Sequence, residues 1–215
     1  MTKPSNISKR RETALKEGSS DYLAKREELV EIAAGQFKQS GYRATTLAEI
    51  GRKAGLDRAT VYYYFGSKEE LFREILRTGV DANMRECVRI SQDGTLDPVE
   101  KLKRVIRQLM TAYDEHYPHM YVYIQEEMER IASEQSVWAR EIIGQTRKFE
   151  RIVTNLIEEA TSAKLLRSDV PVSVSANAIF GMLNWTHRWY RPGGKYSAQL
   201  VSDSFASIFI DGMRA

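Results

Sequence analysis

The chain has 215 residues, of which 28% are charged and 42% hydrophobic, and its formal net charge is +3. This length suits one large domain or a small domain plus a larger one. So small a net charge excludes a strongly basic protein that covers nucleic acid through its overall charge. The single cysteine, Cys87, excludes an intrachain disulfide, and the absence of a signal peptide or a long apolar run predicts a cytoplasmic protein without a membrane partner.

Residues 1–23 hold five Lys or Arg residues among Ser, Thr and Gly, with little apolar periodicity. They predict a flexible basic tail, and a solvated terminus is favoured over an arm that contacts DNA. A helix is expected over residues 24–40, where apolar residues repeat at helical spacing. The positive charge gathers at this end of the chain, because residues 1–80 contain 15 Lys and Arg against 11 Asp and Glu.

The next elements predict two short helices joined by a tight turn. Thr46 can cap the first helix, with Glu49 completing a capping box, and the glycine that opens residues 55–57 can end it. Asp57 can cap the second helix, expected over residues 58–64. A three-residue turn makes the helices cross steeply and pushes the tip of the second outward, as a reader of the DNA major groove requires.

The pattern stays helical after residue 66. Ser67 and Glu70 form a second capping box at the start of a long helix, and no segment alternates with the period of a strand. We therefore expect an all-α chain with a three-helix DNA-binding domain over residues 24–66 and a helical domain over residues 67–215. The further helices are expected over residues 98–116, 118–133, 137–163, 171–190 and 197–213.

The motifs T-T-L-x-x-I, A-G-L, T-V-Y-Y-Y-F and S-K-E-E-L-F occur in this order between residues 45 and 72. In them the chain resembles the DNA-binding domain of TetR-family transcriptional regulators over about its first third. The resemblance implies a double-stranded DNA operator, a homodimer, and a small-molecule effector held in the C-terminal domain. It implies base contacts by Arg58 and Thr60, and phosphate contacts by Thr46, Tyr62, Tyr63 and Lys68.

Two C-terminal segments are candidates for effector binding. Residues 110–131 are rich in Met and Tyr, which suit either an ordinary core or the wall of a pocket for an apolar ligand, and the resemblance favours the pocket. Residues 180–195 combine tryptophan and arginine, which suits a dimer contact or a cationic mouth that grips a carboxylate or phosphate. This segment is similar to TetR regulators of lipid and steroid breakdown, several of which respond to acyl-CoA thioesters. The expected contacts of a bulky, acyl-CoA-like effector are Met110, Tyr113, Tyr117, Tyr121, Trp185 and Arg188.

A two-fold dimer is expected because one helix-turn-helix reads only a short half-site, and two half-sites lie roughly 34–36 Å apart. The last two helices contain small residues that allow close approach and are the expected interface. Its residues would be Ala176, Ile179, Phe180 and Leu183 on one helix, and Leu200, Ser204, Phe205, Ile208 and Phe209 on the other.

Neither a metal, a cofactor nor catalysis is expected. His116 and His119 are separated by a proline between two helices, and no further ligands with zinc spacing complete a set. Nucleophile-elbow and phosphate-loop motifs are absent from the sequence. The leading hypothesis is a ligand-responsive repressor. Two alternatives remain: a DNA-binding regulator whose C-terminal domain only dimerises, and a helical small-molecule-binding protein or enzyme.

Overall fold

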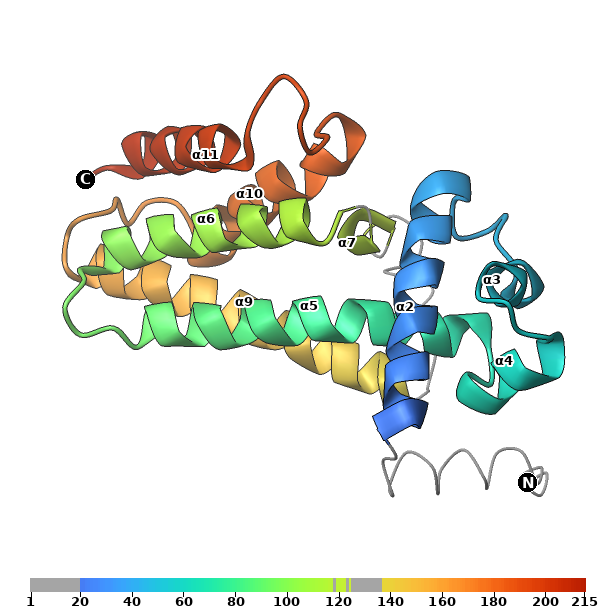
Figure 1. Ribbon diagram of the computed structural model, residues 1–215. Helices are drawn as coiled ribbons and strands as arrows, with labels where there is room; N and C mark the ends of the chain where they lie inside the picture. Colours follow the sequence, from blue (N-terminus) through green and yellow to red (C-terminus); the bar gives the residue numbers. More distant parts are fainter. Residues whose placement is uncertain (1–19, 118, 123, 125–136) are drawn as a thin grey trace. The chain divides into compact units, whose positions relative to one another are not determined.

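The computed structural model describes residues 20–117, 119–122, 124 and 137–215 (Figure 1). The regular elements of the described residues are helices, and the β-type pairing among these residues is limited to one isolated bridge between Leu166 and Arg214. The all-α prediction is therefore confirmed. The helices are α2 (Ser20–Ser40), α3 (Leu47–Lys53), α4 (Arg58–Tyr64), α5 (Lys68–Ser91), α6 (Pro98–Glu115), α7 (His119–Val122), α9 (Val137–Ser162), α10 (Val172–Trp185), the 3-10 turn η2 (Thr186–Arg188) and α11 (Ala198–Met213).

The chain forms two compact units, and the division falls within α5, between Thr78 and Gly79. The boundary expected from the sequence was at the start of this helix, after residue 66. Helix α5 therefore contributes its first half to one unit and its second half to the other.

In the first unit, α2 begins four residues earlier than expected, at Ser20. Tyr22 explains the difference, because it is buried and its ring stacks on Tyr64 at 5.0 Å and meets Tyr63 edge-on at 5.4 Å. The last four residues of the expected tail are thus helical, and Tyr63 and Tyr64 of α4 are half-buried. The rest of that tail, residues 1–19, lies outside the described residues.

An arginine ties three elements of this unit together. The Arg26 guanidinium on α2 lies 4.1 Å from the ring centre of Phe65, the residue that ends α4, and its Nη2 atom lies 3.2 Å from Glu74 Oε2 on α5. Arg26 is buried while Glu74 is partly exposed and also pairs with Arg77 at 2.6 Å, so removing Glu74 would leave the buried Arg26 guanidinium without its carboxylate partner.

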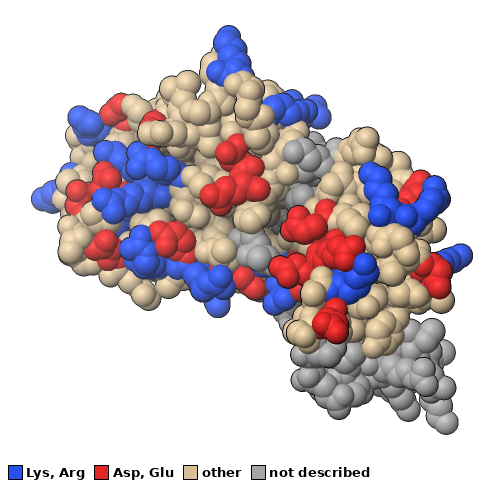
Figure 2. Space-filling view, viewed as in Figure 1, with Lys and Arg blue, Asp and Glu red and all other residues tan. Residues whose placement is uncertain are grey.

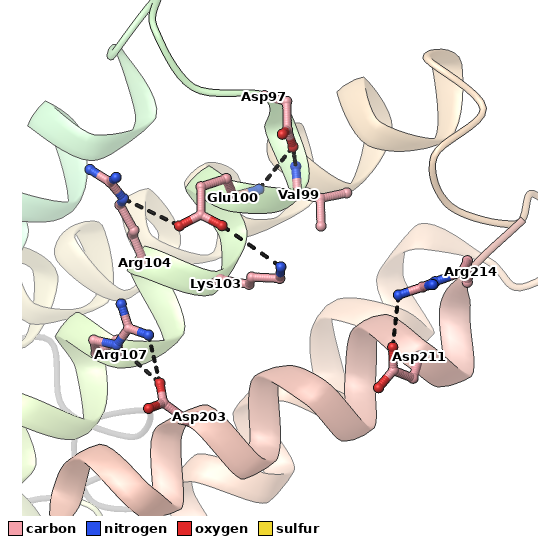
Figure 3. A network of polar contacts seen from close by, with 9 residues as sticks. All are labelled: Asp97, Val99, Glu100, Lys103, Arg104, Arg107, Asp203, Asp211 and Arg214. Carbon is pink, nitrogen blue, oxygen red and sulfur yellow. Dashed lines mark hydrogen bonds and ion pairs between the residues drawn. The ribbon is translucent and has the colours of Figure 1, made fainter.

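In the second unit, α6 packs against both α9 and α11, and α10 packs against the same two helices. Asp97 caps α6 by accepting hydrogen bonds from the first-turn N–H groups of Val99 and Glu100 (Figure 3). Arg107 on α6 pairs with Asp203 on α11 at 2.6 Å, which joins the two helices at their exposed edge.

Most expected helix limits in this unit agree with the structure to within two residues. The exception is α10, which ends at Trp185 and continues as the 3-10 turn η2 instead of running to residue 190. The Thr186 hydroxyl donates to the Leu183 carbonyl, a side-chain bond that competes with regular helix bonding. The expected helix over 118–133 lies largely outside the described residues, which include only α7 and Ile124 from this segment.

Candidate functional site

The helix-turn-helix is fixed by short-range contacts. Thr46 accepts a hydrogen bond from the Glu49 N–H, and the Glu49 carboxylate accepts one from the Thr46 N–H at 2.8 Å, so the predicted capping box is confirmed. Asp57 caps α4 by accepting from the Thr60 N–H at 2.7 Å. This bond lowers the pKa of Asp57 below its ordinary value, because it stabilises the charged form of the carboxylate.

Two glycines allow the tight crossing of α3 and α4. Gly55, in the turn, has φ +67°, a left-handed conformation that residues with a Cβ atom rarely adopt. A Cβ atom on Gly51 would lie 2.6 Å from Val61 Cγ2 and 3.1 Å from the Leu56 carbonyl oxygen. The helices therefore approach as closely as glycine permits, which holds the tip of α4 in a defined direction.

The two residues expected to read bases lie at this tip. Arg58 is exposed and its guanidinium lies 5.5 Å from the ring centre of Tyr62, while Thr60 is half-buried. On the face shown in Figure 2, basic and acidic side chains are interspersed on each unit.

The residues expected to contact phosphates differ in their freedom to do so. The exposed Thr46 hydroxyl lies 2.9 Å from Glu49 Oε2, and Tyr63 packs against Tyr22. The Lys68 ammonium donates to the carbonyl oxygens of Tyr42 at 2.8 Å and of Thr45 at 3.0 Å, and lies 3.4 Å from that of Arg43. An ammonium has three N–H donors, so a phosphate contact by Lys68 would have to replace one of these bonds.

The second unit contains a partly open cavity of about 110 Å³. Its wall is mostly apolar and includes a few amide and hydroxyl groups, as ligand sites commonly do. The described residues that line the cavity come from α5, α6, α7, α9 and α10 and from Ile124, and they are Val80, Asn83, Leu109, Tyr113, Met120, Ile124, Gln145, Thr146, Phe149, Phe180 and Asn184.

Hydrogen bonds fix the polar groups of this wall. The Tyr113 hydroxyl donates to Asn184 Oδ1 at 2.7 Å, which joins α6 to α10. Gln145 Nε2 donates to Asp81 Oδ1 at 2.9 Å, which joins α9 to α5. The described lining residues include neither a carboxylate nor a histidine or cysteine.

Of the six effector contacts expected from the sequence, Tyr113 alone lines this cavity. Met110 is fully buried in the core, because it is turned roughly 100° around α6 from Leu109, which shares the cavity face with Tyr113. Tyr121 is also buried, its hydroxyl lies 2.8 Å from Thr186 Oγ1, and burial raises its pKa to about 12. Tyr117 meets Tyr121 edge-on and is outside the cavity wall.

The other two expected contacts form a surface pair. Trp185 is 59% exposed, and the Arg188 guanidinium lies 5.3 Å from its ring. Most residues of the cavity lining, including Asn83 and Gln145, were not predicted from the sequence. The feature that could have indicated them in the sequence is a polar residue at an inward-facing position of a long amphipathic helix.

The expected dimer residues occupy both buried and exposed positions of the protomer. On α10, Ala176, Ile179 and Leu183 are buried within the protomer, and Phe180 lines the cavity. The exposed face of α10 instead carries Val174, Ala178, Gly181 and Trp185. On α11, Leu200, Ser204 and Ile208 are exposed as an interface would require, whereas Phe205 is half-buried and Phe209 is buried.

The described residues contain no cluster of three or more His, Cys, Asp or Glu side chains that could hold a metal ion. The His119 side chain, part of the weak metal candidate, lies outside the described part of the chain. Among the helices that the structure describes, none combines the length and apolar character needed to cross a membrane.

Two family models match the sequence. Residues 29–75 match the model for bacterial regulatory proteins of the tetR family, and residues 95–213 match the tetracyclin repressor-like C-terminal domain. The chain is 30% identical over 193 residues to the HTH-type transcriptional repressor KstR2 of Mycobacterium tuberculosis, an alignment that covers 88% of this chain and 93% of KstR2.

Solved structures of transcriptional regulators are also similar to this chain. The structure of the ketosteroid transcriptional regulator KstR2 of M. tuberculosis superposes with a TM-score of 0.77, covering 88% of this chain and 95% of that one. PfmR of Thermus thermophilus is 26% identical, with a TM-score of 0.76 over 87% and 99% of the two chains. AibR, in complex with isovaleryl coenzyme A and operator DNA, is 21% identical, with a TM-score of 0.72 over 86% and 97%, and is similar in fold. The chain therefore belongs to the TetR family of bacterial regulatory proteins.

Proposed function

We propose that the protein is a ligand-responsive transcriptional repressor that binds a palindromic operator as a homodimer and leaves it when an effector occupies the cavity. The observation that carries the proposal is the cavity itself, because α5 supplies part of its wall and also begins beside the helix-turn-helix. A ligand that displaces α5 can thereby influence the unit that binds DNA. The homology to KstR2 repressors supports repression as the regulatory outcome.

The cavity supports a ligand-responsive repressor over a regulator whose C-terminal domain only dimerises, because dimerisation alone would not require a pocket in the protomer. The third hypothesis, an enzyme, draws no support from the cavity wall, whose described polar groups are amides and hydroxyls.

We propose an acyl-CoA as the effector, with its acyl group in the cavity and its anionic part outside. About 110 Å³ suits a short or branched acyl group, and a polycyclic or long-chain group would require the wall to open. Asn184 of the wall directly precedes Trp185, whose partner Arg188 offers an exposed cation for a phosphate or carboxylate. AibR provides a precedent within this fold for an acyl-CoA ligand.

The test is to titrate short branched, long-chain and polycyclic acyl-CoAs against the protein–operator complex. An effector coupled to DNA binding by about 1–3 kcal/mol would weaken operator affinity roughly 5- to 150-fold. Free coenzyme A is the control for effects of the anionic part alone. If every thioester leaves the affinity unchanged while a small cation or metal alters it, the effector class is wrong even though the repressor hypothesis survives.

Operator reading is proposed to depend on Arg58. Arg58→Ala should cost about 1–3 kcal/mol at particular base pairs, because an exposed arginine at the tip of α4 can form two hydrogen bonds with one guanine. Gel shifts with single-base operator variants would locate those pairs, and Arg85→Ala, exposed on α5 in the second unit, is the matched control. An equal loss on every sequence would show a phosphate contact instead.

The dimer is proposed to form through the exposed faces of α10 and α11. The small residues Ala178, Gly181 and Ser204 would let helices of two protomers approach closely, and the apolar side chains around them would be removed from water. The proposed interface, named here the α10–α11 face, comprises Val174, Ala178, Gly181, Leu200, Ser204 and Ile208.

A further inference from the structure

We infer that Gln145 selects effectors that carry a hydrogen-bond donor, such as a hydroxyl or N–H group, on the part that enters the cavity. This inference rests on the proposed function in treating the cavity as the effector site. It adds a chemical requirement that an apolar pocket alone would not impose.

An unpaired oxygen carries the argument. Gln145 forms part of the cavity wall, and its Oε1 atom is enclosed without a hydrogen-bond partner among the residues that the structure describes. A buried carbonyl oxygen in this condition costs roughly 1–3 kcal/mol, and so it needs an explanation. A donor group arriving with the ligand would remove this cost, and a ligand without one would leave it in place.

Asp81 determines which atom of the Gln145 amide lacks a hydrogen-bond partner. The Asp81 carboxylate accepts a hydrogen bond from Gln145 Nε2 at 2.9 Å, and an ionised carboxylate can only accept. Turning the amide over would place two oxygens against each other. The free group in the wall is therefore an acceptor, and it requires a donor from the ligand.

The other two amides of the wall already use their oxygens. Asn184 Oδ1 accepts from the Tyr113 hydroxyl at 2.7 Å, and Asn83 Oδ1 accepts from Gln108 Nε2 at 3.2 Å. Among the amides that line the cavity in the described structure, Gln145 is thus the one with an unused acceptor. The wall of the same cavity also includes apolar side chains such as Val80 and Phe149.

The test compares phenol with fluorobenzene, two small rings of similar shape of which phenol alone donates a hydrogen bond. Binding to the full-length protein without DNA is measured by calorimetry or ligand-observed NMR. Wild-type protein should prefer phenol, and Gln145→Met, which keeps the length of the side chain, should lower that preference about tenfold. Gln92→Met, at an exposed position after α5, is the matched control and should preserve it.

Asp81→Leu is a second variant for the case in which Gln145→Met does not fold. It removes the acceptor that orients the amide and leaves the Gln145 Nε2 donor free to turn toward the cavity, so it should also reduce the preference for phenol. If both probes bind and neither variant changes their ratio, the role of Gln145 is refuted while the cavity survives. If neither probe binds wild-type protein at all, the proposed effector cavity itself is wrong.

Discussion

Ile208→Asp is expected to turn the proposed dimer into monomers and to abolish tight operator binding. Ile208 is 63% exposed on α11, within the α10–α11 face. Two-fold symmetry places the new carboxylate in the interface twice, and an unpaired buried ion costs several kcal/mol. At 1.4 kcal/mol per tenfold change, the dimer should dissociate at least about a thousandfold more readily. Sedimentation velocity at micromolar concentration measures this directly, and a gel shift measures the loss of operator affinity.

Asn155→Asp is the control for this experiment. Asn155 is exposed on α9 in the same unit and outside the α10–α11 face, so the substitution adds the same charge without entering the proposed interface. It should leave the protein dimeric. An Ile208→Asp variant that still sediments as a dimer with normal operator affinity would place the interface elsewhere.

The helix-turn-helix could be predicted because its signals act over a few residues. The Thr46 capping box and the Asp57 cap each join groups three positions apart, and Gly55 supplies the left-handed turn by itself. Such contacts form wherever the chain has this local sequence, whatever surrounds it. The early start of α2 was missed because Tyr22 is held by rings of α4, about forty residues later in the chain.

The cavity could not be located from composition. Met110 and Tyr113 belong to the same Met- and Tyr-rich segment, yet one is core and the other lines the cavity. Which face of α6 borders a space depends on how α5, α9 and α10 pack around it. Asn83 and Gln145 reveal the polar part of the wall only once their helices are placed in space.

Helix α10 shows a second limit of sequence patterns. Its residues are apolar on nearly every side, so no polar stripe marks the face that meets water. Ile179 and Leu183 were expected at the dimer interface but fill the protomer core, and Val174 and Trp185 take the exposed side. The sequence therefore identified the helix correctly, and the packing of the protomer decided its two faces.

Lys68→Met is expected to destabilise the DNA-binding unit by about 1.5–3 kcal/mol, the usual contribution of hydrogen bonds to a charged group. The Lys68 ammonium holds the turn between α2 and α3 through the carbonyl oxygens of Tyr42 and Thr45, and it lies 4.4 Å from the Tyr42 ring centre. Methionine keeps most of the length of the side chain but offers none of the three donors. Urea unfolding measures the loss, and Lys53→Met, at an exposed position of α3, supplies the matched control.

The same variant distinguishes a structural role of Lys68 from the phosphate contact implied by the family resemblance. Loss of a phosphate contact lowers the dependence of operator affinity on salt by about one unit of slope. Loss of the hydrogen bonds from Lys68 to the turn would instead weaken operator binding by destabilising the DNA-binding unit. Under conditions where the unit stays folded, the dependence of operator affinity on salt would then be unchanged. Lys68 begins α5, the helix that also lines the cavity. If its role is structural, a displacement of α5 would move the turn that precedes α3 through these hydrogen bonds. The Lys68→Met variant should then respond less to an effector than wild-type protein does, and an unchanged response together with a reduced salt slope would assign Lys68 to the phosphates.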